Sequence, residues 1–241
     1  MTPSLGPYGA FLFDKDGTLV DAFDGWVTLV RALHADLVDW YGAAPLDGEG
    51  ERALGIEGAS VSVGGVIASG TEDELFAVLY HLAGPGAPGW TEFRSRIAAR
   101  AVERFAASPP AVRPLGRVRE TLAALKARGI LLGVATSDTY PNANRDLGPH
   151  GAELFDFWAT TDRVSHPKPH PESIHAFCQA LGLKPEQVVF VGDSRVDLEA
   201  ARAAGVGRFV AVRSQTCPPE VVDGADASVF TVEDLLKLNF Q

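Results

Sequence analysis

Short apolar runs alternate with amphipathic segments along the second half of the chain. A continuous apolar run that ends in turn residues is typical of a buried strand, and apolar residues three or four positions apart are typical of a helix. The apolar runs predict strands at residues 130–135, 157–160, 188–191, 209–212 and 227–230. The amphipathic segments predict helices at residues 118–128, 171–181, 193–204 and 232–238. Alternating strands and helices indicate an α/β fold.

The earliest apolar run, residues 10–13, is followed at once by the polar sequence Asp14-Lys15-Asp16-Gly17. This pattern predicts a first buried strand that breaks into a loop. Repeated strand–helix units with unbroken apolar strands predict a parallel, Rossmann-like sheet with helices on both faces. In such a sheet, ligands bind in the crevice beyond the carboxyl ends of the strands. The loop that begins at Asp14 is therefore a candidate functional site.

The segment from residue 23 to residue 107 shows helical spacing only. Its apolar residues recur at intervals of three and four positions, and glycine-rich joints separate the periodic stretches. This pattern predicts a small all-helical domain at residues 23–107, inserted after the first strand. Residues 1–22 and 108–241 then form the α/β core domain.

Charge and composition narrow the possible partners and the cell compartment. The 241 residues carry 21 Lys and Arg against 31 Asp and Glu, a formal net charge of −10. Nucleic acid and anionic membranes bind basic patches, so this charge argues against both as partners. No apolar stretch is long enough to span a membrane, and residues 1–10 show no secretory signal. Two cysteines without a disulfide framework predict a cytoplasmic protein, while its oligomeric state stays open.

Chemically active side chains are expected at the carboxyl ends of three predicted strands. They are Asp14 and Asp16 after the first strand, Thr136 after residues 130–135, and Asp193 after residues 188–191. Lys168, between two prolines, precedes the helix at residues 171–181, and Asp197 lies four residues beyond Asp193, on the same helix face. These positions predict a crevice where carboxylates, a hydroxyl and an ammonium group converge.

The carboxylates in this crevice predict a bound cation. Asp14, Asp16 and Asp193 would repel one another, and at least one pKa would rise unless a cation intervened. Oxygen ligands without His or Cys suit a hard ion, and Mg²⁺ takes one or two carboxylates together with water and phosphate oxygens. We therefore expect Mg²⁺ as the cofactor, with Asp197 as a ligand or as support for the ligands.

The spacing suggests a chemical role for each residue. Asp14 closes the strand, where its carboxylate can attack a phosphorus atom and form an aspartyl-phosphate. Asp16 returns to the same side two positions on, so it can protonate the leaving oxygen and then deprotonate water. Gly17 allows a tight turn whose N–H groups cradle phosphate. Thr136 and Lys168 can bind the equatorial oxygens, where charge collects in the transition state.

Four elements of the chain resemble motifs of the haloacid dehalogenase superfamily. Residues 13–21, FDKDGTLVD, are similar to its first motif. Thr136, Lys168 and residues 191–197, VGDSRVD, are similar to its second, third and fourth motifs, in that order. The resemblance covers nearly the whole chain, because residues 22–107 fall where the family inserts its helical cap. It implies Mg²⁺-dependent hydrolysis of a phosphoester through phospho-Asp14.

The resemblance also implies finer roles. Asp16 would be the acid/base, and the metal would be held by Asp14, the Asp16 main-chain carbonyl and Asp193. Ser137 stands where many relatives have Asn, at a phosphate contact, and Arg52 lies in the half of the cap where relatives place specificity residues. The expected partner is a small phosphorylated metabolite, as in phosphoglycolate phosphatase-like enzymes of the superfamily.

Two other functions are compatible with parts of this pattern. A phosphosugar mutase of the same superfamily also needs the second aspartate, and isomerised product without net phosphate release would identify it. A phospho-acceptor signalling domain also uses a strand-end aspartate, Mg²⁺, a hydroxyl and a lysine, although such domains are shorter and carry no helical insertion. A long-lived phospho-Asp14 without turnover would identify the signalling domain.

Overall fold

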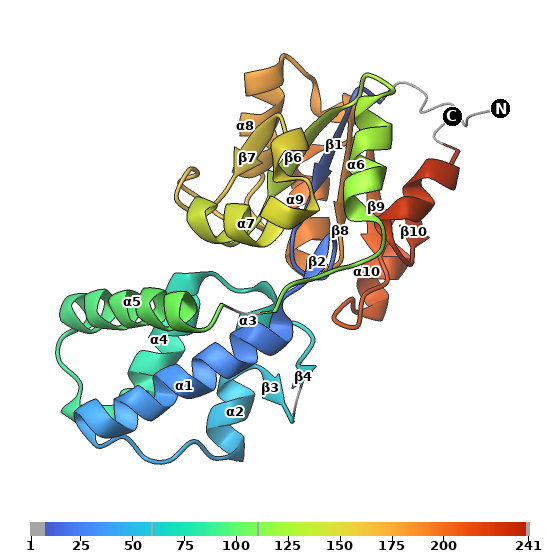
Figure 1. Cartoon of the computed structure of the whole chain (residues 1–241). Coiled ribbons are helices and arrows are strands. Elements are labelled where there is room, and N and C mark those ends of the chain that lie inside the picture. Colours follow the sequence, from blue (N-terminus) through green and yellow to red (C-terminus); the bar gives the residue numbers. More distant parts are fainter. Residues whose placement is uncertain (1–7, 59, 110, 240–241) are drawn as a thin grey trace. The chain divides into compact units, whose positions relative to one another are not determined.

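A computed structural model describes residues 8–58, 60–109 and 111–239 (Figure 1). Residues 1–7, most of the segment in which no secretory signal is expected, lie outside the described residues. The chain forms two compact units, one of Met1–Asp21 with Arg113–Gln241 and the other of Ala22–Val112. We call them the core unit and the insert unit.

Within the described residues, the centre of the core unit is a six-stranded parallel sheet with the order β10-β9-β8-β1-β6-β7. Its strands are β1 (Ala10–Phe13), β6 (Leu131–Ala135), β7 (Phe157–Ala159), β8 (Val188–Gly192), β9 (Arg208–Val212) and β10 (Ala227–Val229). The predicted parallel, Rossmann-like sheet is confirmed. Each strand lies close to its expected bounds, because a continuous apolar run marks a strand buried on both faces.

Helices cover the sheet of the core unit (Figure 1). They are α6 (Val118–Lys126), α7 (Tyr140–Leu147), α8 (Glu172–Leu181), α9 (Arg195–Ala204), α10 (Pro219–Gly224) and the 3-10 helix η5 (Val232–Lys237). Helices α8, α9 and α10 share one apolar cluster with Ala10 and Leu12 of β1. Successive side chains of a strand point to opposite faces, so Phe11 and Phe13 serve the other face, and all four residues are fully buried.

Three of these helical segments differ from the sequence-based expectation. The sequence of α7, YPNANRDL, holds too few apolar residues to give a periodic signal, and α10 is only six residues long. Residues 232–237 were expected in an α-helix and form the 3-10 helix η5. Short or polar helices such as these are positioned by tertiary contacts, which leave little trace in the local pattern.

The register of β1 with its two neighbours places the candidate residues at one edge of the sheet. Phe13 pairs with Val134 of β6 and with Val191 of β8. The backbone N–H of Asp14 also donates to the Val191 carbonyl over 2.8 Å. The segments that follow β1, β6 and β8 therefore leave the sheet at the same level.

Helices make up most of the insert unit. They are α1 (Phe23–Tyr41), α2 (Gly48–Leu54), α3 (Val66–Ser69), α4 (Glu72–Ala83) and α5 (Trp90–Ala107). Asp36 of α1 accepts hydrogen bonds from Arg100 and Arg104 of α5, which ties these two helices together. A small hairpin of β3 (Ile56–Glu57) and β4 (Ser60–Val61) was not predicted, because two-residue strands show no alternation.

A short antiparallel pair marks the place where the chain leaves and re-enters the core unit. It consists of β2 (Val20–Asp21) and β5 (Arg113–Pro114), and the side chains of Asp21 and Arg113 form an ion pair of 2.8 Å.

In the described part of the chain, no helix combines the length and the apolar character needed to cross a membrane.

Candidate active site

Asp14 follows β1 directly and is 7% exposed. Its Oδ1 accepts a hydrogen bond of 2.6 Å from Lys168 Nζ. Burial raises the pKa of Asp14 to about 7, and the nearby Asp197 carboxylate adds to the rise, while Lys168 opposes it. A strand-end carboxylate in this environment favours a nearby positive charge.

Lys168 lies in the loop before α8, and its ammonium group is buried. It donates to Asp14 Oδ1 over 2.6 Å and to Asp197 Oδ1 over 2.7 Å. Burial alone would lower the pKa of Lys168, but these two carboxylates raise it above its usual value. Lys168 is therefore a fixed positive charge beside the Asp14 carboxylate.

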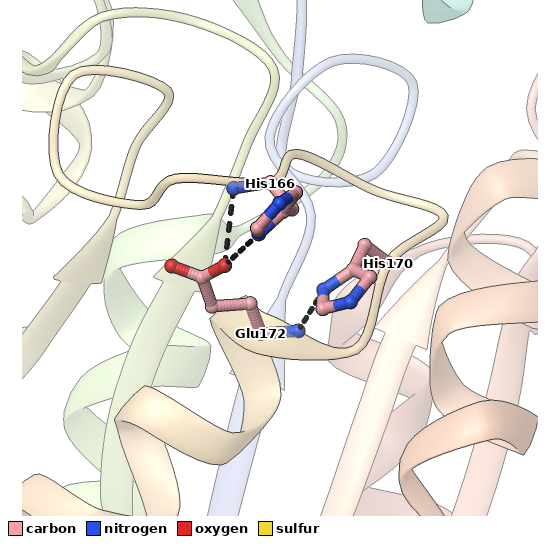
Figure 2. Close-up of side chains that lie close together, drawn as sticks. All are labelled: His166, His170 and Glu172. Carbon is pink, nitrogen blue, oxygen red and sulfur yellow. Dashed lines mark hydrogen bonds and ion pairs between the residues drawn. The ribbon is translucent and has the colours of Figure 1, made fainter.

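The loop that carries Lys168 is shaped by Glu172. The Glu172 carboxylate accepts hydrogen bonds from the backbone N–H groups of Ser165 and His166 and lies 2.6 Å from His166 Nδ1. Figure 2 shows that the backbone N–H of Glu172 donates to His170 Nδ1 over 3.2 Å. Three ligand atoms gather here within 4.8 Å of one another, but the atoms in Figure 2 already bond to one another and lie at the positive N-terminus of α8. We assign this cluster to loop structure.

Asp193 and Asp197 lie after β8 and in the first turn of α9. Asp197 Oδ2 accepts hydrogen bonds from the Ser194 hydroxyl over 2.6 Å and from the Ser194 backbone N–H over 3.0 Å, so Asp197 belongs to the capping box of the helix. Asp193 is 2% exposed. Burial raises the pKa of Asp193 to about 7, and Asp197 adds to the rise.

Two hydroxyl groups that the sequence reasoning missed contact Asp193. The Ser214 and Thr216 hydroxyls donate to Asp193 Oδ2 over 2.6 and 2.7 Å, which lowers the pKa of Asp193 against the effect of burial. Both residues follow the carboxyl end of β9, two strands from β1 in the sheet. Ligands bind beyond the carboxyl ends of parallel strands, and this rule identified Asp14. Applied to β9, the same rule would have identified Ser214 and Thr216.

The buried carboxylates fit a divalent cation. One ligand atom from each of Asp14, Asp193 and Asp197 lies within 4.8 Å of the other two. The donors are all oxygen atoms, which hard cations such as Mg²⁺ prefer. Lys168 contacts two of these carboxylates and balances only part of their charge. The donor chemistry and the charge deficit both suit a divalent ion.

Gly17 is required at its position for two separate reasons. Its φ of +77° lies in the left-handed region, which strains any residue with a side chain. A Cβ atom on Gly17 would also lie 2.1 Å from Asp193 Oδ2. The loop can therefore pass close to Asp193 only with glycine here.

Asp16 and Asp14 contact different lysines. The two carboxylate oxygens of Asp16 are each 2.8 Å from Lys15 Nζ, and 20% of its side chain is exposed. Burial raises the pKa of Asp16 to about 7, while Lys15 opposes the rise and Asp138 adds to it. The contact with Lys15, which is itself fully buried, was not predicted from the sequence.

The remaining predicted residues lie as follows. Thr136 follows β6 and is buried, with its hydroxyl accepting a hydrogen bond of 3.2 Å from the backbone N–H of Asp138. Ser137 is half-buried beside it. Arg52 is exposed in the last turn of α2, in the insert unit, and its predicted contact with substrate stays a prediction.

Comparison with known proteins agrees with the motifs. Residues 8–205 match the family model for haloacid dehalogenase-like hydrolase. The chain is 29% identical over 212 residues to N-acetylmuramic acid 6-phosphate phosphatase from Pseudomonas aeruginosa, covering 88% of this chain and 84% of that protein. It therefore belongs to the haloacid dehalogenase-like hydrolase family and is an enzyme.

Solved structures show the same fold. The structure of a predicted phosphoglycolate phosphatase from Haemophilus somnus superposes with a TM-score of 0.75 at 24% identity, covering 97% of this chain and 99% of that one. A putative beta-phosphoglucomutase from Thermotoga maritima gives a TM-score of 0.67 at 26% identity, covering 95% and 96% of the two chains. Both likenesses extend over nearly the whole length of each chain.

Proposed function

We propose that the protein is a Mg²⁺-dependent phosphatase that hydrolyses a small organic phosphate monoester through a phosphorylated Asp14. The observation that carries this proposal is the group of three buried carboxylates with Lys168 at the carboxyl ends of β1 and β8. In such a group the carboxylates can bind a divalent cation, and the lysine beside them can bind phosphate. The family and the N-acetylmuramic acid 6-phosphate phosphatase relative support a phosphatase.

The first chemical step forms the aspartyl-phosphate. Lys168 binds Asp14 Oδ1, which leaves Oδ2 to attack phosphorus. As the bond from Oδ2 to phosphorus forms, the bond from phosphorus to the ester oxygen breaks. Asp16 gives its proton to the departing oxygen, so that an alcohol leaves and Asp16 becomes a carboxylate.

The second step releases phosphate. Asp16 takes a proton from water, and the water oxygen attacks the phosphorus atom of phospho-Asp14. The bond from phosphorus to Asp14 breaks, inorganic phosphate leaves, and Asp14 returns to its carboxylate form. Asp16 thereby regains the proton that it lost in the first step, so the cycle is balanced.

Other residues of the chain position the phosphate and the cation. Asp14, the Asp16 main-chain carbonyl and Asp193 would hold the Mg²⁺, with Asp197 in support, and the bound ion would neutralise charge on the phosphoryl group. Thr136, Ser137 and Lys168 would bind the equatorial oxygens, and the N–H groups after Gly17 would cradle them.

The insert unit would act as the cap that selects the substrate. Its position in the chain, Ala22–Val112, follows the first strand and its loop, and α2 presents Arg52 as an exposed cation. A cap over the crevice favours small substrates because it excludes water and bulky ligands. The relative that acts on a phosphorylated amino sugar makes sugar phosphates the first class to test.

Neither cysteine forms a disulfide, which supports a cytoplasmic location.

A phosphosugar mutase is the second candidate, favoured by the fold likeness to a putative beta-phosphoglucomutase. A mutase would use the same Asp14 and Asp16 and would return the phosphoryl group to sugar instead of water. The two activities differ in their products: a phosphatase releases inorganic phosphate, and a mutase yields an isomerised sugar phosphate.

A Mg²⁺-dependent screen of phosphorylated metabolites tests the proposal. We expect release of inorganic phosphate from at least one sugar phosphate or from phosphoglycolate, with no release after removal of the metal by EDTA. Asp14→Asn should reduce turnover by about 10⁴-fold or more. Wild-type turnover in Asp14→Asn, or isomerisation without phosphate release, would contradict the proposal.

A further inference from the structure

A second buried charge cluster lies beside the candidate site, around Lys15. The Lys15 side chain has no exposed surface, although its neighbours in the chain are the two predicted catalytic aspartates. Its Nζ lies 2.8 Å from both Asp16 oxygens, 2.8 Å from Asp138 Oδ2 and 2.9 Å from Asp146 Oδ2. Three carboxylates thus surround one ammonium group, which has three N–H donors.

Two of these carboxylates, those of Asp138 and Asp146, are nearly fully buried and anchor Lys15. Asp146, in α7, is 1% exposed at its side chain and also binds Arg145. Asp138 lies in the loop after β6 and is 8% exposed at its side chain. Asp16 differs from them because 20% of its side chain is exposed. Asp138 and Asp146 therefore hold the ammonium in place, and the ammonium in turn holds Asp16.

The contact with Lys15 restricts the conformation of the Asp16 side chain. A partly exposed aspartate at a loop turn can change its side-chain torsion angles, and each rotamer would direct the carboxylate to a different place. An ammonium close to both oxygens favours one rotamer. An acid/base residue must lie within hydrogen-bond reach of the leaving oxygen, so this restriction bears directly on proton transfer.

We propose that Lys15 is a positioning residue that holds the Asp16 carboxylate in place for proton transfer, with Asp138 and Asp146 as its anchors. This inference rests on the proposed function, in which Asp16 is the acid/base. Lys15 cannot touch substrate itself, because its side chain is completely buried. Its effect on the reaction passes through Asp16.

The dependence of the rate on the leaving group separates this role from a merely structural one. An alkyl phosphate needs a proton on its departing oxygen, whereas 2,4-dinitrophenyl phosphate releases a stable phenolate without one. The ratio kcat/KM reports the steps up to departure of the leaving group, so later hydrolysis of phospho-Asp14 does not affect it. Both substrates are measured on one preparation, so a partly unfolded variant lowers both values equally.

The experiment compares Lys15→Met, Asp16→Asn and the wild type on 2,4-dinitrophenyl phosphate and on an alkyl phosphate. The alkyl phosphate is the one hydrolysed fastest in the metabolite screen, beginning with N-acetylmuramic acid 6-phosphate. We expect Lys15→Met to lose about 10²-fold in kcat/KM on the alkyl phosphate and less than about threefold on the aryl phosphate. Asp16→Asn should show the same preference more strongly. Lys126→Met, which removes a surface ion pair with Asp156, should change neither value.

A second variant guards against failure of Lys15→Met to fold. Asp146→Asn removes the negative charge of one anchor and leaves Lys15 in contact with Asp138, so we expect a selective loss of a few-fold on the alkyl phosphate. Equal losses on both substrates in Lys15→Met, or in Asp146→Asn if only that variant folds, would overturn the inference while the proposed function stands. If Asp16→Asn itself shows no preference, the acid/base role fails and the inference fails with it.

Discussion

Two buried lysines contact the two aspartates of the first loop, and they do so in different ways. Lys168 binds Asp14 and Asp197 and comes from a loop 154 residues away from Asp14. Lys15 binds Asp16 and comes from the loop itself. The comparison shows that two carboxylates separated by one residue have separate cationic partners. Each carboxylate can therefore be perturbed without direct loss of the other's contact.

The two lysines also differ in what else surrounds them. The partners of Lys168 belong to the carboxylate group that suits a divalent cation. Lys15 has two further partners, Asp138 and Asp146, which lie outside that group. They anchor Lys15 from the loop after β6 and from α7. We call the first set the Lys168 side and the second the Lys15 side. The Lys168 side is expected to serve phosphate and metal, and the Lys15 side to serve proton transfer.

Among the changes that compare the Lys168 side with the Lys15 side, Lys168→Met is expected to have the largest effect. This change removes a charge that would bind both Asp14 and an equatorial phosphate oxygen, so kcat/KM should fall by about 10²- to 10³-fold. The fall should be similar for an alkyl phosphate and for 2,4-dinitrophenyl phosphate, because every substrate carries the same phosphoryl group. Steady-state kinetics on both substrates measures this. A selective loss on the alkyl phosphate would place Lys168 with Lys15 and erase the distinction between the two sides.

The next largest effect is expected from removing the two hydroxyl groups that donate hydrogen bonds to Asp193. Ser214→Ala with Thr216→Ala removes two hydrogen bonds to Asp193 Oδ2, which hold the carboxylate in place. The Mg²⁺ concentration for half-maximal activity should rise by about 10- to 100-fold, the usual cost of losing such support. Activity titrations with Mg²⁺ measure the shift. An unchanged Mg²⁺ requirement would remove Asp193 from the metal site.

The pH dependence of metal binding tests the Lys168 side in a different way. Burial raises the pKa values of Asp14 and Asp193 to about 7 from 3.8, so the folded chain keeps protons that the unfolded chain releases between about pH 4 and pH 7. Without metal, the unfolding free energy contributed by these groups therefore falls as the pH rises through this window. Mg²⁺ displaces the protons, so its affinity should rise by about tenfold per pH unit for each proton displaced.

Thermal unfolding at pH 5.5, 6.5 and 7.5, with and without Mg²⁺, measures this linkage. The increase in Tm caused by Mg²⁺ should grow with pH. Asp193→Asn removes one of the titrating carboxylates and should flatten the dependence. A Tm increase that is the same at all three pH values would contradict the raised pKa values.

The smallest effect is expected from the insert unit. Arg52→Ala should lower kcat/KM by a few-fold on the sugar phosphate that the enzyme prefers, and it should leave 2,4-dinitrophenyl phosphate unaffected. Arg94→Ala is the matched control, because Arg94 is an exposed arginine of the same unit that pairs with Asp73. Equal effects of the two variants would remove Arg52 as a specificity residue.

The fold was predictable where the pattern was local. Each strand of the sheet is a continuous apolar run, and the carboxyl ends of β1, β6 and β8 directed attention to Asp14, Thr136 and Asp193. The polar helix α7 gave no periodic signal and was missed. Missing α7 also hid Asp146, and with it the reason why a lysine in a strand-end loop is buried.

The contacts of the site were less predictable because they join distant parts of the chain. Lys15 and Asp146 are 131 residues apart, and neither position shows a feature that would distinguish it from a solvated charge. Ser214 and Thr216 were predictable in principle, since they follow a strand end at the same edge. The proposed contact of Arg52 with substrate does not follow from the helical pattern of the insert unit, because that pattern describes packing.

Trapping the enzyme during turnover identifies the residue that holds the phosphoryl group. The enzyme is mixed with its substrate and Mg²⁺, quenched in acid within the first turnovers, digested and analysed by mass spectrometry. We predict one phosphorylated peptide, containing residues 10–21, with the phosphoryl group on Asp14 and no such peptide from Asp14→Asn. A phosphoryl group on another residue, or continued turnover by Asp14→Asn, would contradict the account.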